Sequence, residues 1–113
     1  MSIKPMEGIW EVLLTETAEQ DYIDIIRWTV QNFGEHQAKT YSLTLNLALA
    51  TLEKSPNIIG AKQREELGAR IYTLHVVRNG KKGRHIIVFC ASERNTIEVL
   101  RLLHDSMDFE SHL

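Results

Sequence analysis

The chain has 113 residues, of which 43% are hydrophobic and 25% are charged, with a single cysteine. This length suffices for one hydrophobic core and is too short for two, so we expect a single domain over residues 1–113. We find no apolar run near the ~20 residues that cross a bilayer and no secretory signal, and a lone cysteine cannot form an internal disulfide. These features favour a cytoplasmic protein with no membrane partner.

The charges are unevenly distributed, although the formal net charge is only −2. Residues 1–60 carry eight acidic and four basic side chains, whereas residues 61–92 carry seven basic and two acidic ones, a local excess of five positive charges. Such a segment within an acidic chain suggests an anionic partner, either nucleic acid or an acidic protein segment. A solvated hairpin tip kept soluble by lysines explains the same pattern equally well.

The N-terminal part predicts a strand followed by a helix. Residues 9–14 form a short apolar strand with one polar interruption, which we expect to be buried on most of both faces. A helix follows over about residues 17–33, because apolar side chains recur there at helical spacing. Thr17 and Gln20 fit a capping box at its start, and Gly34 can adopt the left-handed conformation that ends a helix.

A second helix begins almost at once and covers about residues 35–54, with apolar side chains again at helical spacing. It ends before Pro56, because the residue that precedes a proline avoids helical geometry. The connection between the two helices is short, which predicts an antiparallel helical hairpin. Residues 57–69 are interpreted as a polar loop.

After this loop the apolar residues recur with a period of 2 residues instead of 3.6, which predicts strands. Residues 71–77 form one strand and residues 86–91 the returning strand, with turn-forming residues at 79–83. A further turn at 93–95 leads to a third strand over residues 96–103. The predicted fold class is therefore α+β: an N-terminal strand, an antiparallel helical hairpin, and a three-stranded antiparallel meander.

Four stretches of the chain carry motifs of a known family. Residues 14–28 are similar to its strand-to-helix opening, residues 34–56 to its helical turn and second helix, and residues 85–90 to its central strand. Residues 97–108 are the most specific stretch. They are similar to the closing strand of the family, which commonly ends in Leu-His, two variable residues and Met-Asp, as residues 103–108 do here. The chain thus resembles the ParE toxins, a branch of the RelE/ParE superfamily of type II toxin–antitoxin systems, and the resemblance implies the RelE/ParE toxin fold over about residues 9–113.

The resemblance to ParE implies a toxin that binds and inhibits DNA gyrase, and so stops replication. It also implies a cognate ParD-like antitoxin, encoded beside the toxin, that neutralises it. Operator DNA would then be contacted only indirectly, through the antitoxin. This interpretation predicts a binding protein rather than an enzyme, and it requires no cofactor.

The alternative is an RelE-like, ribosome-dependent mRNA endoribonuclease. Cleavage of RNA by this mechanism needs a base for the ribose hydroxyl, cations on the phosphate and an acid for the leaving oxygen. RelE proteins commonly carry a tyrosine near the C-terminus, and this chain has none after Tyr72. A third interpretation is a degenerate toxin that serves only as an antitoxin-bound scaffold.

The residues expected to bind the target are mostly basic. Arg70 and Arg78 flank the first strand of the meander at even spacing, so both point to the same face, and if that face is the exposed concave side of the sheet they are the best candidates for an anionic partner. Arg84 and His104 are also assigned to target binding, although Arg84 can equally be a solubilising turn residue. In the nuclease alternative these four side chains and Lys81 would converge on a phosphate, with His104 as the general base. Ordinary surface salt bridges for the arginines, and capping of the last strand for His104, are the competing explanations.

The antitoxin is expected to bind an apolar groove of the helical hairpin and an uncovered apolar part of the neighbouring sheet face. The residues assigned to this surface are Tyr22, Ile26, Tyr41, Leu45, Leu49, Tyr72 and Leu74.

No metal site is expected, because Cys90, His104 and His112 show no known ligand spacing. The apolar C-terminal segment around Phe109 either docks on the sheet of its own domain or contacts a partner.

Overall fold

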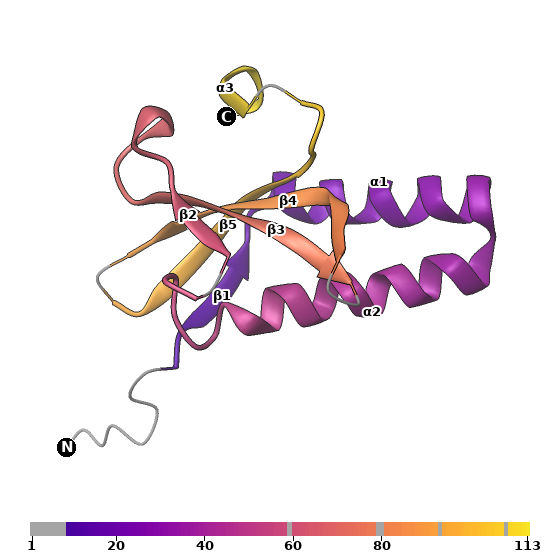
Figure 1. The fold of residues 1–113 in the computed structure, drawn as a ribbon, viewed down its shortest axis with the longest axis horizontal. Coiled ribbons are helices and arrows are strands. Elements are labelled where there is room, and N and C mark those ends of the chain that lie inside the picture. Colours follow the sequence, from indigo (N-terminus) through magenta and orange to yellow (C-terminus); the bar gives the residue numbers. More distant parts are fainter. Residues whose placement is uncertain (1–8, 59, 79–80, 93, 108) are drawn as a thin grey trace.

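A computed structural model describes residues 9–58, 60–78, 81–92, 94–107 and 109–113. Its elements in chain order are β1 (Glu11–Leu14), α1 (Glu16–Phe33), α2 (Glu35–Thr51), β2 (Ala61–Gln63), the 3₁₀ turn η1 (Glu65–Leu67), β3 (Ile71–Arg78), β4 (Lys81–Ala91), β5 (Thr96–His104) and α3 (Phe109–His112). The strands form one sheet in the order β1-β5-β4-β3-β2. Helices α1 and α2 form a hairpin that projects beyond the sheet (Figure 1). The predicted α+β class is confirmed.

The ends of α1 are set by a threonine and a glycine. The hydroxyl of Thr15 accepts a hydrogen bond from Ala18 N at 3.0 Å, so the cap is Thr15, and the prediction that Thr17 caps the helix is wrong. Thr15 was the better candidate because its hydroxyl also donates to Leu100 O at 3.0 Å, which fixes the helix start against β5. Gly34 adopts a φ of +90° and donates its N–H to Val30 O, which confirms its predicted role.

The antiparallel meander β3-β4-β5 is confirmed, and two further strands lie at the edges of the sheet. β1 runs parallel to β5, and β2 pairs antiparallel with β3 inside the segment expected to be a loop. Because β1 is an edge strand, its alternate side chains Glu11 and Leu13 are exposed, so the expectation that both faces are buried is wrong. Lys81–Gly83, expected in a turn, belong to β4, whereas Asn79 and Gly80 lie outside the described residues.

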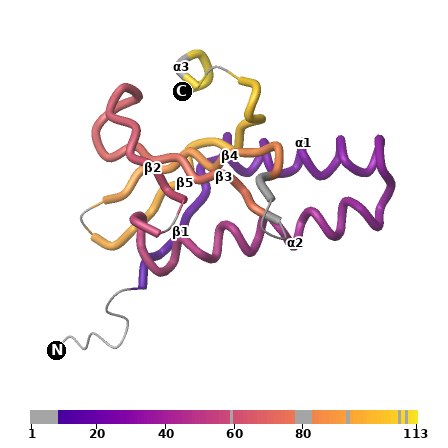
Figure 2. Tube along the Cα trace, viewed as in Figure 1, coloured from indigo at the N-terminus to yellow at the C-terminus, as the bar shows by residue number. Residues whose placement is uncertain are grey.

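The core lies between the helical hairpin and one face of the sheet. Phe89 and Ile87 of β4 contribute fully buried side chains from the centre of this face, and Leu45 and Leu52 approach it from α2. Helix α3 lies on the other side of the sheet from α2 (Figure 2). In the described part of the chain, no helix is both long and apolar enough to cross a membrane.

Candidate functional site

A groove runs along the junction of α1 and α2. Its wider part has a volume of about 670 Å³ and is lined by Tyr22, Ile23, Ile26, Arg27, Val30, Gln31 and Ser42. A smaller hollow lined by Leu14, Glu19, Tyr22, Ile23, Asn46 and Leu49 shares two of these residues. The two hollows therefore adjoin each other, and we call them together the helix groove.

The helix groove combines apolar walls with a polar floor. Ile23 is 47% exposed, and Val30 is also exposed although both are large aliphatic residues. On the floor, the hydroxyl of Tyr22 lies 2.7 Å from Ser42 Oγ and donates to Asn46 Oδ1 at 2.8 Å. Exposed aliphatic side chains that line a concavity usually mark a partner site.

The structure divides the residues assigned to the antitoxin between this groove and the core. Tyr22, Ile26 and Leu49 line the helix groove. Leu45 is 0% exposed and Leu74 is 6% exposed, so their assignment to a free surface is wrong.

Two aromatic residues of that assignment also belong to the interior. The ring of Tyr72 stacks on Phe89 at a centroid distance of 5.4 Å, and Tyr41 packs against the core from α2. The face of the sheet that was expected to be uncovered is the one that the helices cover.

The basic residues assigned to the target do not converge. The carbonyl of Arg70 accepts a hydrogen bond from Ala91 N, whereas His104 pairs with His85. Ala91 and His85 are six residues apart on β4, which at ~3.3 Å per residue separates Arg70 from His104 by roughly 20 Å. The convergence on one phosphate that the nuclease alternative requires is therefore contradicted for this pair.

The even-spacing argument for Arg70 and Arg78 also fails. Arg70 has a φ of +61°, which is not strand geometry, so the alternation of side chains along β3 does not extend to it. The register of β3 and β4 is irregular between His75 and Val77, close to Arg78. Arg84 lies opposite this irregular part of β3, between Lys82 and Ile86 of β4, and its side chain is exposed.

A polar cluster lies where the end of the sheet meets α2. The hydroxyl of Tyr41 lies 2.6 Å from His85 Nδ1, and the ring of His85 meets the edge of His104 at a centroid distance of 5.6 Å. His104 Nδ1 lies 2.7 Å from Ser106 Oγ and 3.4 Å from Asp105 Oδ1. Because the serine and the carboxylate approach the same ring nitrogen, they do not form a Ser-His-Asp relay, which uses both nitrogens.

Burial and neighbouring charges keep the inner members of this cluster neutral. Burial, followed by the neighbouring His104, lowers the pKa of His85 to about 4, although Asp105 opposes the shift. Burial, followed by Asp105, raises the pKa of Tyr41 to about 12. A group of either kind is poorly matched to proton transfer near neutral pH. Among the described residues there is also no group of three side chains suited to hold a metal ion.

The shifted pKa of His85 predicts acid sensitivity. Between pH 6.5 and 4 the unfolded chain binds a proton at this histidine while the folded chain does not, so stability falls as the pH is lowered through this window. Because the ring is only partly buried, water screens part of the effect, and we expect a loss of roughly 2 kcal/mol. Urea denaturation at pH 7 and pH 4 measures it.

The matched control for this prediction is a pair of glutamine variants. His85→Gln retains a polar partner for Tyr41 and should lose about 2 kcal/mol less than the wild type between pH 7 and 4. His36→Gln changes an exposed histidine of α2 and should follow the wild-type pH dependence. Equal pH dependence in the wild type and His85→Gln would contradict the assignment to His85.

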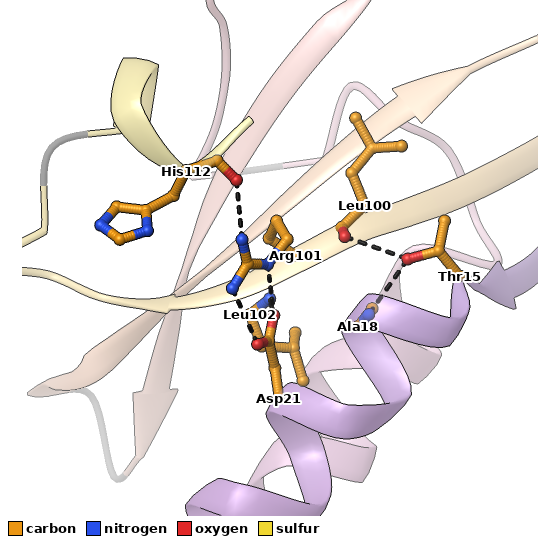
Figure 3. A network of polar contacts seen from close by, with 7 residues as sticks. All are labelled: Thr15, Ala18, Asp21, Leu100, Arg101, Leu102 and His112. Atoms are coloured by element: carbon orange, nitrogen blue, oxygen red, sulfur yellow. Dashed lines mark hydrogen bonds and ion pairs between the residues drawn. The ribbon is translucent and has the colours of Figure 1, made fainter.

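A second polar network joins α1 to β5 (Figure 3). Asp21 accepts hydrogen bonds from Arg101 Nε at 2.8 Å, Arg101 Nη2 at 3.0 Å and Leu102 N at 2.9 Å. β1 ends at Leu14, so the outer edge of β5 has no strand partner beyond that point. The side chains of Thr15 and Asp21 satisfy this edge instead. No local sequence pattern indicates this pairing, because Asp21 and Arg101 are 80 residues apart.

Solved structures of toxin–antitoxin systems share this architecture. A chain of the chromosomal ParDE system from P. aeruginosa matches with a TM-score of 0.71 at 18% identity, over 86% of this chain and 97% of that chain. A chain of the RelBE2 toxin–antitoxin complex from Mycobacterium tuberculosis matches with a TM-score of 0.57 at 18% identity, over 85% and 91% of the two chains. This chain therefore shares its fold with chains of these two systems.

The sequence identifies the family. Residues 12–109 match the family described as ParE toxin of the type II toxin–antitoxin system parDE. Toxin ParE1 of Caulobacter vibrioides is 28% identical over 100 residues, which cover 88% of this chain and 94% of that protein. The chain belongs to the ParE toxin family of type II toxin–antitoxin systems.

Proposed function

We propose that this ParE-family toxin inhibits DNA gyrase, and thereby replication, and that a cognate ParD-like antitoxin holds it inactive. The observation that carries the proposal is the family match over residues 12–109. The structurally similar chains come from systems named as toxin–antitoxin pairs, which supports an antitoxin partner for this chain as well.

The helix groove is the proposed antitoxin site. Its exposed aliphatic walls at Ile23 and Val30 suit the apolar face of an amphipathic segment. The hydroxyl and amide groups of Tyr22 and Asn46 on its floor suit a polar side chain of the same segment, which would fix its register. Burying this surface stabilises the toxin as long as the antitoxin is bound.

The basic residues proposed to bind the target are spread along the sheet and do not form one cluster. Arg70 and His104 lie near opposite ends of the sheet, with Arg84 and Arg78 near the end that carries His104. An arrangement of this kind suits contacts spread over a large protein surface, where several charges steer association. Catalysis would instead need an acid and a base within hydrogen-bond reach of one reacting group.

The decisive experiment compares two activities of one protein preparation. We expect the purified toxin to inhibit supercoiling by DNA gyrase and to leave ribosome-bound mRNA intact, and we expect added antitoxin to restore supercoiling. Replacing Arg70 and Arg78 together with alanine should weaken gyrase inhibition about tenfold while the melting temperature stays within a few degrees, because surface charges contribute little to stability. Ribosome-dependent cleavage of mRNA with undisturbed supercoiling would overturn the proposal in favour of the RelE-like nuclease.

A further inference from the structure

Four residues form a row across the face of the sheet that points away from the helical hairpin. Thr73 of β3 pairs with Val88 of β4, and Val88 pairs with Arg101 of β5. Arg64, which follows β2, donates from Nη1 to Thr73 Oγ1 at 3.4 Å. The row therefore begins and ends with a guanidinium group and has a small polar and a small apolar side chain between them.

The C-terminal helix α3 spans this row. The guanidinium carbon of Arg64 lies 5.1 Å from the centroid of the Phe109 ring, and Arg101 Nη1 donates to His112 O at 2.7 Å (Figure 3). Phe109 and His112 are three residues apart, which is about one helical turn. α3 thus connects the two arginines and crosses the strands between them.

The burial of Val88 shows that the middle of this face is covered. Val88 alternates along β4 with Ile87 and Phe89, which face the helical hairpin, so its side chain points to the opposite face. It is nevertheless 0% exposed, and Thr73 beside it is also buried. Helix α3 lies over this face of the sheet (Figure 1).

Both arginines also have ion-pair partners in the body of the domain. Arg64 Nε contacts Glu66 Oε2 at 2.7 Å, and Arg101 is fixed by Asp21. Each guanidinium group is therefore oriented in part by the domain itself. The contacts that α3 makes with these two arginines are a ring contact and a hydrogen bond, and a helix of one turn is not stable by itself.

We propose that the row Arg64-Thr73-Val88-Arg101 is a peptide-binding site, which the C-terminal segment of the chain occupies in cis. A partner that competes for it would carry an acidic segment with an aromatic residue, followed one helical turn later by a hydrogen-bond acceptor. The occupant seen in the structure argues for this chemistry, because it presents a ring to one guanidinium group and a carbonyl to the other. This site is separate from the helix groove and does not depend on the gyrase proposal.

The charge of the chain supports the same occupant. Residues 105–113 contain three acidic side chains and no lysine or arginine, whereas the row begins and ends with an arginine. An acidic segment is therefore attracted to this part of the sheet. Because the C-terminal segment is tethered to the domain, its effective concentration at the row is high. A free peptide of the same sequence competes with it and therefore binds weakly, unless the contacts of the tethered segment are weakened.

The test uses a fluorescein-labelled peptide with the sequence of residues 105–113, added to the full chain and followed by fluorescence anisotropy. Phe109→Ala in the full chain removes the ring that contacts Arg64 and so weakens the cis occupant. We expect this variant to bind the labelled peptide at least tenfold more tightly than the wild type does. The same peptide with alanine in place of its phenylalanine should bind at least tenfold more weakly to the variant.

A matched pair of arginine variants locates the site. In the Phe109→Ala background, Arg64→Gln should weaken peptide binding at least fivefold, whereas Arg94→Gln, an exposed arginine outside the row, should leave it unchanged. Melting temperatures check that each protein is folded, and Phe109→Leu replaces Phe109→Ala if the latter does not fold. Equal affinity of the folded wild type and the folded Phe109 variant would overturn the proposal, as would equal effects of the two arginine substitutions.

Discussion

Alanine in place of Asp21 is expected to destabilise the protein by about 3 kcal/mol and to lower its melting temperature by roughly 10 °C. The carboxylate is largely buried and accepts three hydrogen bonds, two from Arg101 and one from the backbone of Leu102. Its removal leaves a guanidinium group and an N–H of β5 without their acceptor, and unsatisfied buried donors carry most of the cost. Urea denaturation measures the change.

Asp24, one turn along the same helix, provides the control. It is exposed, and its carboxylate accepts a hydrogen bond from Gln20 at the surface. Asp24→Ala should therefore change the free energy of unfolding by less than about 0.5 kcal/mol. A loss at Asp21 as small as the loss at Asp24 would show that the network of Figure 3 contributes little to stability.

Aspartate in place of Ile23 is expected to weaken binding of the antitoxin about 100-fold, which corresponds to about 2.7 kcal/mol. Ile23 lines both parts of the helix groove, so a carboxylate there would be desolvated against the apolar face of the partner. The residue is already half-exposed in the free protein, so the fold tolerates the charge. Isothermal titration calorimetry with the C-terminal segment of the antitoxin measures the affinity.

Leu47 is the matched control for this experiment. It is a 69% exposed aliphatic residue of α2 that does not line the groove. Leu47→Asp should change the affinity by less than about threefold, because the charge remains in water on another side of the helix. If both substitutions weaken binding to the same extent, the antitoxin does not use the groove as its main site.

The order of the large elements could be predicted because the spacing of apolar residues distinguishes helices from strands. The change from a period of 3.6 to a period of 2 after Pro56 separates the helical hairpin from the meander, and the stop at Gly34 follows from its φ of +90°. β2 could not be found in this way, since a strand of three residues is too short to show alternation. These three residues form a strand because they pair with the free edge of β3, and their own sequence does not indicate that edge.

The candidate sites depended on information that local sequence does not hold. Helix α2 has apolar residues on several sides, so its sequence does not reveal that Leu45 is fully buried in the core while Leu49 also lines the helix groove. The neighbourhood of His85 and His104 follows from the register of β4 and β5. A bulge next to Val88 shifts that register, and nothing in the alternation of either strand indicates it.

The parallel pairing of β1 with β5 has a consequence for biosynthesis. The contact between Thr15 and Leu100 spans 85 positions, and within the described part of the chain β1 pairs with β5 alone. A growing chain exposes its first strand and both helices well before β5 leaves the ribosome, and contacts of such long range form late. Once the hairpin has emerged, the nascent toxin thus presents an apolar hairpin with an unfinished sheet. A partner that recognises the hairpin alone can engage it before the toxin is complete.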